Sequence, residues 1–150
     1  MQAFITLAAF LLTLGVLVSF HEFGHFLAAR CCGVRVLRFA VGFGKPLFTF
    51  RAKNQTEWVL ASIPLGGYVK LLDGRDREQV ISPQDQASAF DSKKLWQRSL
   101  IVAAGPFANF FLAVILFAVI YISGVPQLPA VLDTPPEHSL AAKLDLVQGD

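Results

Sequence analysis

Two long apolar stretches dominate the pattern of hydrophobic and polar positions along the chain. The first runs from about residue 3 to residue 29, and residues 1–20 carry no charged side chain. The second runs from about residue 99 to residue 124 and contains no Asp, Glu, Lys or Arg. Each is longer than the roughly 20 residues that an α-helix needs to cross a bilayer. The pattern therefore predicts two transmembrane helices, 1–30 and 99–124.

The stretch between these helices has a different pattern. Two short apolar runs, 47–50 and 57–63, flank the polar stretch 51–56, which predicts a β-hairpin. Pro64 is expected to break the second strand. Strands with open edges cannot face lipid, but they can enter a membrane where they line a cavity in protein. Two interpretations stay open, a sheet that dips into the membrane beside the end of the first helix and an ordinary small sheet on the cytoplasmic surface.

Composition and charge support a membrane protein and set its orientation. Hydrophobic residues make up 54% of the chain and charged residues 16%. Twelve of the thirteen Lys and Arg residues fall within residues 30–98. The positive-inside rule then predicts that 30–98 is cytoplasmic and that both ends of the chain lie on the outer side of the membrane. The first stretch lacks a basic start and is too long for a signal peptide, so we expect it to be retained. Nothing in the charge pattern indicates nucleic-acid binding.

The first apolar stretch ends in the sequence His21-Glu22-Phe23-Gly24-His25, an HExxH motif. Residues four apart lie on one face of a helix, so both imidazoles can bind one tetrahedral Zn²⁺ ion. Glu22 can take a proton from a water that the zinc activates. A catalytic zinc site usually has three protein ligands, so the third must come from elsewhere. Unpaired ionisable groups in an apolar helix are costly, which makes a chance occurrence a poor explanation.

Other polar residues are weaker candidates for the metal. His138 lies among prolines and polar residues and reads as an exposed loop residue. Cys31 and Cys32 fall on the side of the membrane where thiols stay reduced, and a structural role is favoured for them.

Further features concern the second helix and the chain that follows it. Residues 75–98 read as a surface loop that leads into an amphipathic interfacial segment containing Trp96. Gly105 and Asn109 share one face of the second helix, where a small residue permits close packing and an Asn in lipid needs a partner. Residues 125–150 read as a polar, proline-bearing linker with a short helix, 139–146, and we expect a further domain to be cut short there.

Four segments together resemble the amino-terminal half of bacterial site-2 proteases, which are intramembrane zinc metalloproteases. In order along the chain they are HEFGHFLAAR, GFGKPLF, IPLGGYVKLLDG and QRSLIVAAGPFANFFLA. The segment SLAAKLDLVQGD is similar to the opening of a PDZ domain. The resemblance implies an α-helical polytopic membrane protein of the bacterial inner membrane. It has two transmembrane helices, a re-entrant β segment at 31–74 and the start of a PDZ-like domain.

The resemblance also implies a function and its residues. His21 and His25 correspond to zinc ligands, and Glu22 corresponds to the catalytic acid and base. Gly66, Gly67, Tyr68 and Asn109 correspond to residues that face substrate. The implied substrates are single-span membrane proteins already trimmed by another protease, such as an anti-sigma factor, and the implied surroundings are membrane lipid.

The third zinc ligand of the family is an Asp in an LDG sequence on a later helix. This chain contains Leu72-Asp73-Gly74, but it follows the β segment and lacks the Asn and Pro residues that accompany the ligand. We therefore do not assign Asp73 and expect the ligand beyond residue 150. Two alternatives stay open, a non-catalytic membrane fragment that binds a substrate or partner, and a metal-handling membrane protein.

Overall fold

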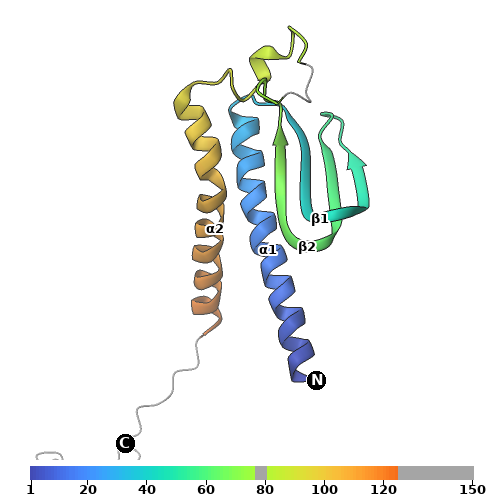
Figure 1. Cartoon of the computed structure of the whole chain (residues 1–150). Coiled ribbons are helices and arrows are strands. Elements are labelled where there is room, and N and C mark those ends of the chain that lie inside the picture. Colours follow the sequence, from blue (N-terminus) through green and yellow to red (C-terminus); the bar gives the residue numbers. More distant parts are fainter. Residues whose placement is uncertain (77–80, 125–150) are drawn as a thin grey trace, which may run out of the picture. The chain divides into compact units, whose positions relative to one another are not determined.

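The computed structural model describes residues 1–76 and 81–124 (Figure 1). Their elements are α1 (Gln2–Cys31), β1 (Val36–Arg51), β2 (Glu57–Leu71), a 3₁₀ turn (Gln86–Ser88) and α2 (Leu95–Ser123). Residues 1–116 form one compact unit, which contains every element that builds the site. The expectations for residues 125–150, including the PDZ-like start, the helix 139–146 and His138, lie outside the described residues.

Both long helices form where the apolar pattern predicts them. α1 and α2 have 30 and 29 residues, and both are long and apolar enough to cross a membrane. In α1, the hydroxyl groups of Thr6, Thr13 and Ser19 donate to backbone carbonyls one turn earlier, so these polar groups are satisfied within the helix. The most apolar window of α1 has no buried residue, so its side chains point outward, as lipid-facing side chains would. α2 begins at Leu95, four residues before the predicted start, and includes part of the predicted interfacial segment.

The sheet is longer than predicted, because β1 and β2 extend well beyond the two apolar runs. The strands pair as one antiparallel hairpin through Arg51↔Glu57 and neighbouring pairs. The hairpin also folds back on itself, since residues 38–41 pair with 67–70 on one side and with 57–60 on the other. In the pairing of 38–41 with 57–60, the residue numbers increase together on both sides, so these two segments run parallel to each other. The resulting order of segments is 67–71, 36–41, 57–61 and 46–51, as the ribbons in Figure 1 show.

Each strand bends where a glycine adopts a positive φ. β1 bends at Gly42 and Gly44, with φ of 89° and 88°, and β2 bends at Gly66, with φ of 108°. These values lie in a region that residues with a Cβ rarely adopt. The prediction that Pro64 ends a strand is wrong, because Pro64 lies inside β2. It sits at the bend between the pairs Phe43↔Ile63 and Val41↔Gly67, where its missing N–H breaks no ladder bond.

The sheet packs against α1 through aromatic side chains. Phe26 of α1 lies 5.8 Å from Phe39 and 5.2 Å from Trp58, measured between ring centroids, and both contacts are T-shaped. Buried Val34, Val36 and Ile101 continue this core toward the end of α1 and the first turns of α2. The packing places the sheet beside the helix that carries HExxH, and the association of the sheet with the membrane stays a prediction.

Candidate functional site

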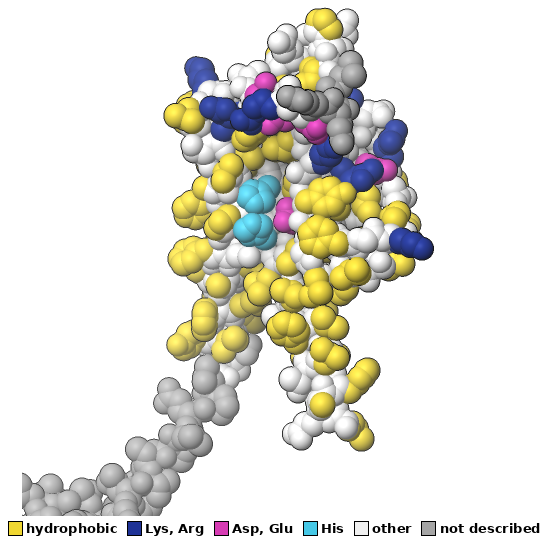
Figure 2. Space-filling model, in the orientation of Figure 1, with side chains coloured by type: hydrophobic (Ala, Val, Ile, Leu, Met, Phe, Trp, Pro, Cys, Tyr) yellow, Lys and Arg dark blue, Asp and Glu magenta, His cyan; other side chains and the backbone are white. Residues whose placement is uncertain are grey.

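The two histidines of HExxH face each other on α1. Their Nε2 atoms are 3.2 Å apart, and Figure 2 shows the two rings side by side. A tetrahedral zinc ion with Zn–N bonds of 2.0–2.1 Å would hold two nitrogen ligands about 3.3 Å apart. Both side chains are half-buried, so the pair is reachable from outside. The separation of these nitrogens therefore fits a zinc ion shared by His21 and His25.

The other ring nitrogen of His25 is hydrogen-bonded to α2. Nδ1 of His25 lies 2.7 Å from the backbone oxygen of Ile101. A carbonyl oxygen can only accept, so Nδ1 carries a proton, and in the neutral ring Nε2 is then the nitrogen with the lone pair. Metal-binding histidines usually have such a partner on the nitrogen that does not face the metal. The tautomer imposed on His25 is thus the one that a metal needs.

Glycines allow α1 and α2 to approach closely at this point. A Cβ added at Gly24 would overlap the carbonyl oxygen of Ala104 and lie 2.7 Å from Cβ of Ala108. A Cβ added at Gly105 would overlap Nε2 of His25 and lie 2.7 Å from Nε2 of His21. The close helix packing predicted for Gly105 is therefore present, and it takes place against the histidine pair itself.

Glu22 lies between the histidines and the sheet. A Cβ added at Gly67 of β2 would be 2.9 Å from Cγ of Glu22 and 2.7 Å from the carbonyl oxygen of Ala40. Gly67 belongs to the outermost segment of the sheet, and no strand pairs with the other side of residues 67–70 within the described part of the chain. The carboxylate is thus placed between the candidate metal ligands and an edge of the sheet.

The other β2 residues that the resemblance implicated lie next to Gly67. A Cβ added at Gly66 would overlap the ring of Phe43. The ring of Tyr68 stacks on that of Phe43 with centroids 6.4 Å apart, and its hydroxyl accepts a hydrogen bond from Arg38. Arg38 in turn pairs with Glu57. Of these three consecutive residues, Gly67 lies against Glu22, and Gly66 and Tyr68 both lie against Phe43.

Asn109 is one helical turn beyond Gly105 on α2, and residues four apart share a face. Its side-chain Oδ1 is buried and has no hydrogen-bond partner among the described residues. Burying an amide oxygen without a hydrogen-bond partner is costly. The Oδ1 of Asn109 can therefore accept a hydrogen bond from a bound ligand.

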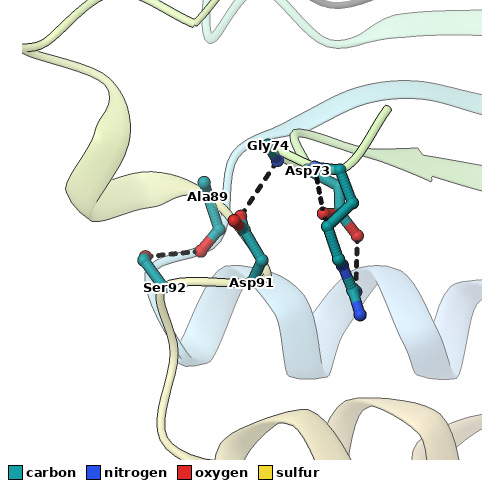
Figure 3. A network of polar contacts seen from close by, with 6 residues as sticks. Asp73, Gly74, Ala89, Asp91 and Ser92 are labelled. Atoms are coloured by element: carbon teal, nitrogen blue, oxygen red, sulfur yellow. Dashed lines mark hydrogen bonds and ion pairs between the residues drawn. The ribbon is translucent and has the colours of Figure 1, made fainter. Parts of the chain in front are cut away.

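Asp73 has partners of its own away from the histidines. Its carboxylate accepts hydrogen bonds from Nε and Nη2 of Arg75 at 3.0 and 2.7 Å, and Gly74 is held by Asp91 (Figure 3). The hydrogen bonds from Arg75 hold the pKa of Asp73 below its usual value. Asp73 is therefore engaged in a local ion pair, which agrees with leaving it out of the metal site.

The described residues supply only two ligands for a metal. Residues 1–76 and 81–124 contain no cluster of three or more His, Cys, Asp and Glu side chains able to hold an ion. Cys32 is buried and Cys31 exposed, and both are free thiols outside any such cluster. The donor set fits zinc in type and spacing but leaves a third protein ligand to come from elsewhere.

Comparison with known proteins adds the family. The profile of peptidase family M50 matches residues 9–147. The chain belongs to peptidase family M50. Within this family, the chain is 47% identical over 143 residues to the regulator of sigma-E protease RseP of Escherichia coli, covering 95% of the chain and 31% of that relative. It is 45% identical over 139 residues to a candidate zinc metalloprotease of Pasteurella multocida, covering 93% of the chain and 31% of the relative.

These family members bear out the resemblance of the sequence motifs to the site-2 proteases, and to the regulator of sigma-E protease among them. A second candidate zinc metalloprotease, from Neisseria meningitidis, is 48% identical over 145 residues. The chain spans about a third of the length of the curated relatives it matches.

Sequence reasoning missed three contributors to the site of this M50 chain. They are Gly24, the backbone carbonyl of Ile101 and Phe43. Gly24 carried a usable signal, because a glycine three residues after His21 lies on the same helix face and marks where another helix can approach. The carbonyl of Ile101 carried none, since every residue has one.

Proposed function

We propose that this chain is the catalytic part of a zinc-dependent endopeptidase that cuts membrane proteins within or near the bilayer. The observation that carries the proposal is the 3.2 Å separation of the two Nε2 atoms on a helix long enough to span a membrane. Membership of family M50 supports the same conclusion.

In this proposal His21 and His25 hold a zinc ion whose charge lowers the pKa of water to about 7 and so supplies a nucleophile at neutral pH. Glu22 accepts the proton of the attacking water and donates it to the leaving nitrogen of the scissile peptide bond. An Asp in sequence beyond residue 150 serves as the third protein ligand.

The proposed substrate is a single-span membrane protein, already trimmed by another protease, whose helix unwinds locally at the site. A helical peptide bond is shielded by its own hydrogen bonds, so the segment must become extended before it can react. The edge formed by residues 67–70 can hold such a segment through main-chain hydrogen bonds, in the manner of strand addition. Gly66, Gly67 and Tyr68 would contact it from β2, and Asn109 would contact it from α2 through its amide oxygen, which has no partner among the described residues.

The E. coli relative is named for regulation of sigma-E. We propose, on that likeness, that the substrate is a membrane-bound regulator such as an anti-sigma factor, cut during regulated intramembrane proteolysis. The protein would then lie in the bacterial inner membrane, surrounded by lipid, with residues 30–98 cytoplasmic and both ends of this chain periplasmic. The positive charges concentrated in 30–98 support that orientation.

One observation favours a second function: residues 1–76 and 81–124 supply only two protein ligands, which make an incomplete catalytic site. A chain that lacked a third ligand would bind a substrate or partner without cutting it.

Stripping and restoring the metal tests the proposal. The full-length protein, purified in detergent and treated with a chelator, is expected to stop cutting a single-span substrate and to recover when one equivalent of zinc is added. His21→Ala and His25→Ala should not recover. Full cleavage by the stripped protein would contradict zinc dependence, and absence of both zinc and cleavage in the untreated protein would favour the non-catalytic alternative.

A further inference from the structure

One turn of α2, from Ile101 to Gly105, contacts both nitrogens of the His25 ring. At one end, Nδ1 of His25 donates to the carbonyl oxygen of Ile101 at 2.7 Å. At the other end, the Cα of Gly105 comes so close that an added Cβ would overlap Nε2. The ring of His25 is therefore held between two backbone groups of α2 that lie four residues apart.

His21 is held differently. Its Nε2 would be 2.7 Å from a Cβ at residue 105, so Gly105 also borders this ligand. Within the described residues, Nδ1 of His21 has no hydrogen bond comparable to that of His25. The turn of α2 thus fixes the tautomer of one histidine and limits the space around both.

We propose that the turn Ile101–Gly105 is the positioning element of the metal site. The Ile101 carbonyl sets the tautomer and ring angle of His25, and the absence of a side chain at Gly105 leaves room for both Nε2 atoms to converge. The inference rests on the proposed function in one respect, namely that the histidine pair binds zinc.

The distance between the helices is set by a separate contact. Gly24 lies between the two histidines in sequence and is buried against the backbone oxygen of Ala104. A side chain there would push α2 away from α1 as a whole. Gly24 and Gly105 therefore affect the site in different ways: Gly24 through helix packing and Gly105 through the ligand atoms themselves.

This difference gives a test with matched variants. At Gly105 a methyl group would meet mainly the ends of histidine side chains, which can rotate away when no metal is bound. Gly105→Ala is therefore expected to leave the melting temperature of the metal-free protein close to that of the wild type. Its zinc affinity should fall by about 10- to 100-fold, the usual effect of disturbing the groups that orient metal ligands.

Two variants serve as controls. Gly15→Ala changes a glycine of the same helix as the histidines at a position where an added Cβ meets nothing within 4 Å, so it should keep wild-type affinity. The methyl group of Gly24→Ala would clash with the backbone of Ala104, so this variant should lower both the melting temperature and the zinc affinity. Affinity is measured on the full-length protein in detergent by competition with a chromophoric chelator, and the ligand geometry is followed by the visible absorption of bound Co²⁺.

A second measurement needs no variant. Nitrogen NMR of the histidine-labelled wild type, without metal, should show His25 protonated at Nδ1, with assignment by comparison with His25→Gln. Protonation at Nε2 instead would overturn the role of Ile101. Wild-type zinc affinity and an unchanged Co²⁺ spectrum in Gly105→Ala would overturn the role of Gly105. If the wild type itself binds no zinc, the proposed function fails, which is a different result from either of these.

Discussion

Gly67 of β2 lies directly against Glu22 of α1. A Cβ at residue 67 would be 2.9 Å from Cγ of Glu22 and 3.1 Å from Cγ1 of Val18. A sheet segment can approach a helix this closely only where it has no side chain. The contact brings an edge of the sheet to the proposed catalytic carboxylate, so that an extended peptide added to that edge would run past Glu22.

Gly67→Ala should therefore separate metal binding from cleavage. The added methyl would clash with Glu22 and with the backbone oxygen of Ala40, so the edge segment must move away from α1. A displacement of about 1 Å can reduce a rate by about 100-fold when it changes how substrate is held. We expect cleavage of a single-span substrate to fall by at least tenfold while the zinc content stays at one ion per protein. Cleavage at the wild-type rate would show that this contact does not position substrate.

Asp73→Asn should leave the metal content unchanged. Asp73 is paired with Arg75, and its LDG sequence is separate from the histidine pair. We expect the variant to contain as much zinc as the wild type, by elemental analysis of the purified full-length protein, and to keep its cleavage activity. Loss of zinc on this substitution, with the melting temperature unchanged, would identify Asp73 as a ligand and reverse its exclusion.

Trp58→Ala should destabilise the packing of the sheet against α1. Trp58 contacts Phe26 and Phe39 with ring centroids 5.2 and 4.6 Å apart. Truncating a fully buried aromatic residue costs about 3 kcal/mol, and Trp58 is half-buried, so the cost should be smaller but the melting temperature should still fall by several degrees. Trp96→Ala is the matched control, because Trp96 is 61% exposed and its removal in detergent should change the melting temperature little. Equal effects of the two substitutions would contradict the packing role of Trp58.

The helices and the chemistry of the site could be predicted from the sequence because local patterns encode them. An uncharged stretch of membrane length specifies a helix, and a four-residue spacing places His21 and His25 on one face. Glu22 follows from the same motif. These features depend on neighbours in sequence alone.

The path of the sheet could not be predicted in the same way. The pairing of residues 38–41 with two different parts of β2 is set by contacts far apart in sequence, and it needs the bends at Gly42, Gly44 and Gly66. The glycines were visible, but their positive φ values were not. Pro64 was misjudged for the same reason, since a proline that breaks a straight strand is tolerated at a bend. The hydrogen bond from His25 to Ile101 joins residues 76 positions apart and leaves no trace in composition.

The most direct test of the central claim is a comparison of the wild type with Glu22→Gln in the full-length protein, reconstituted with a single-span substrate. The glutamine keeps the shape of the side chain but cannot accept a proton, and general-base catalysis contributes about 10²- to 10⁴-fold. We predict one zinc ion per protein in both forms and a loss of cleavage of at least 100-fold in the variant. Cleavage by Glu22→Gln at the wild-type rate, with zinc bound, would contradict the account.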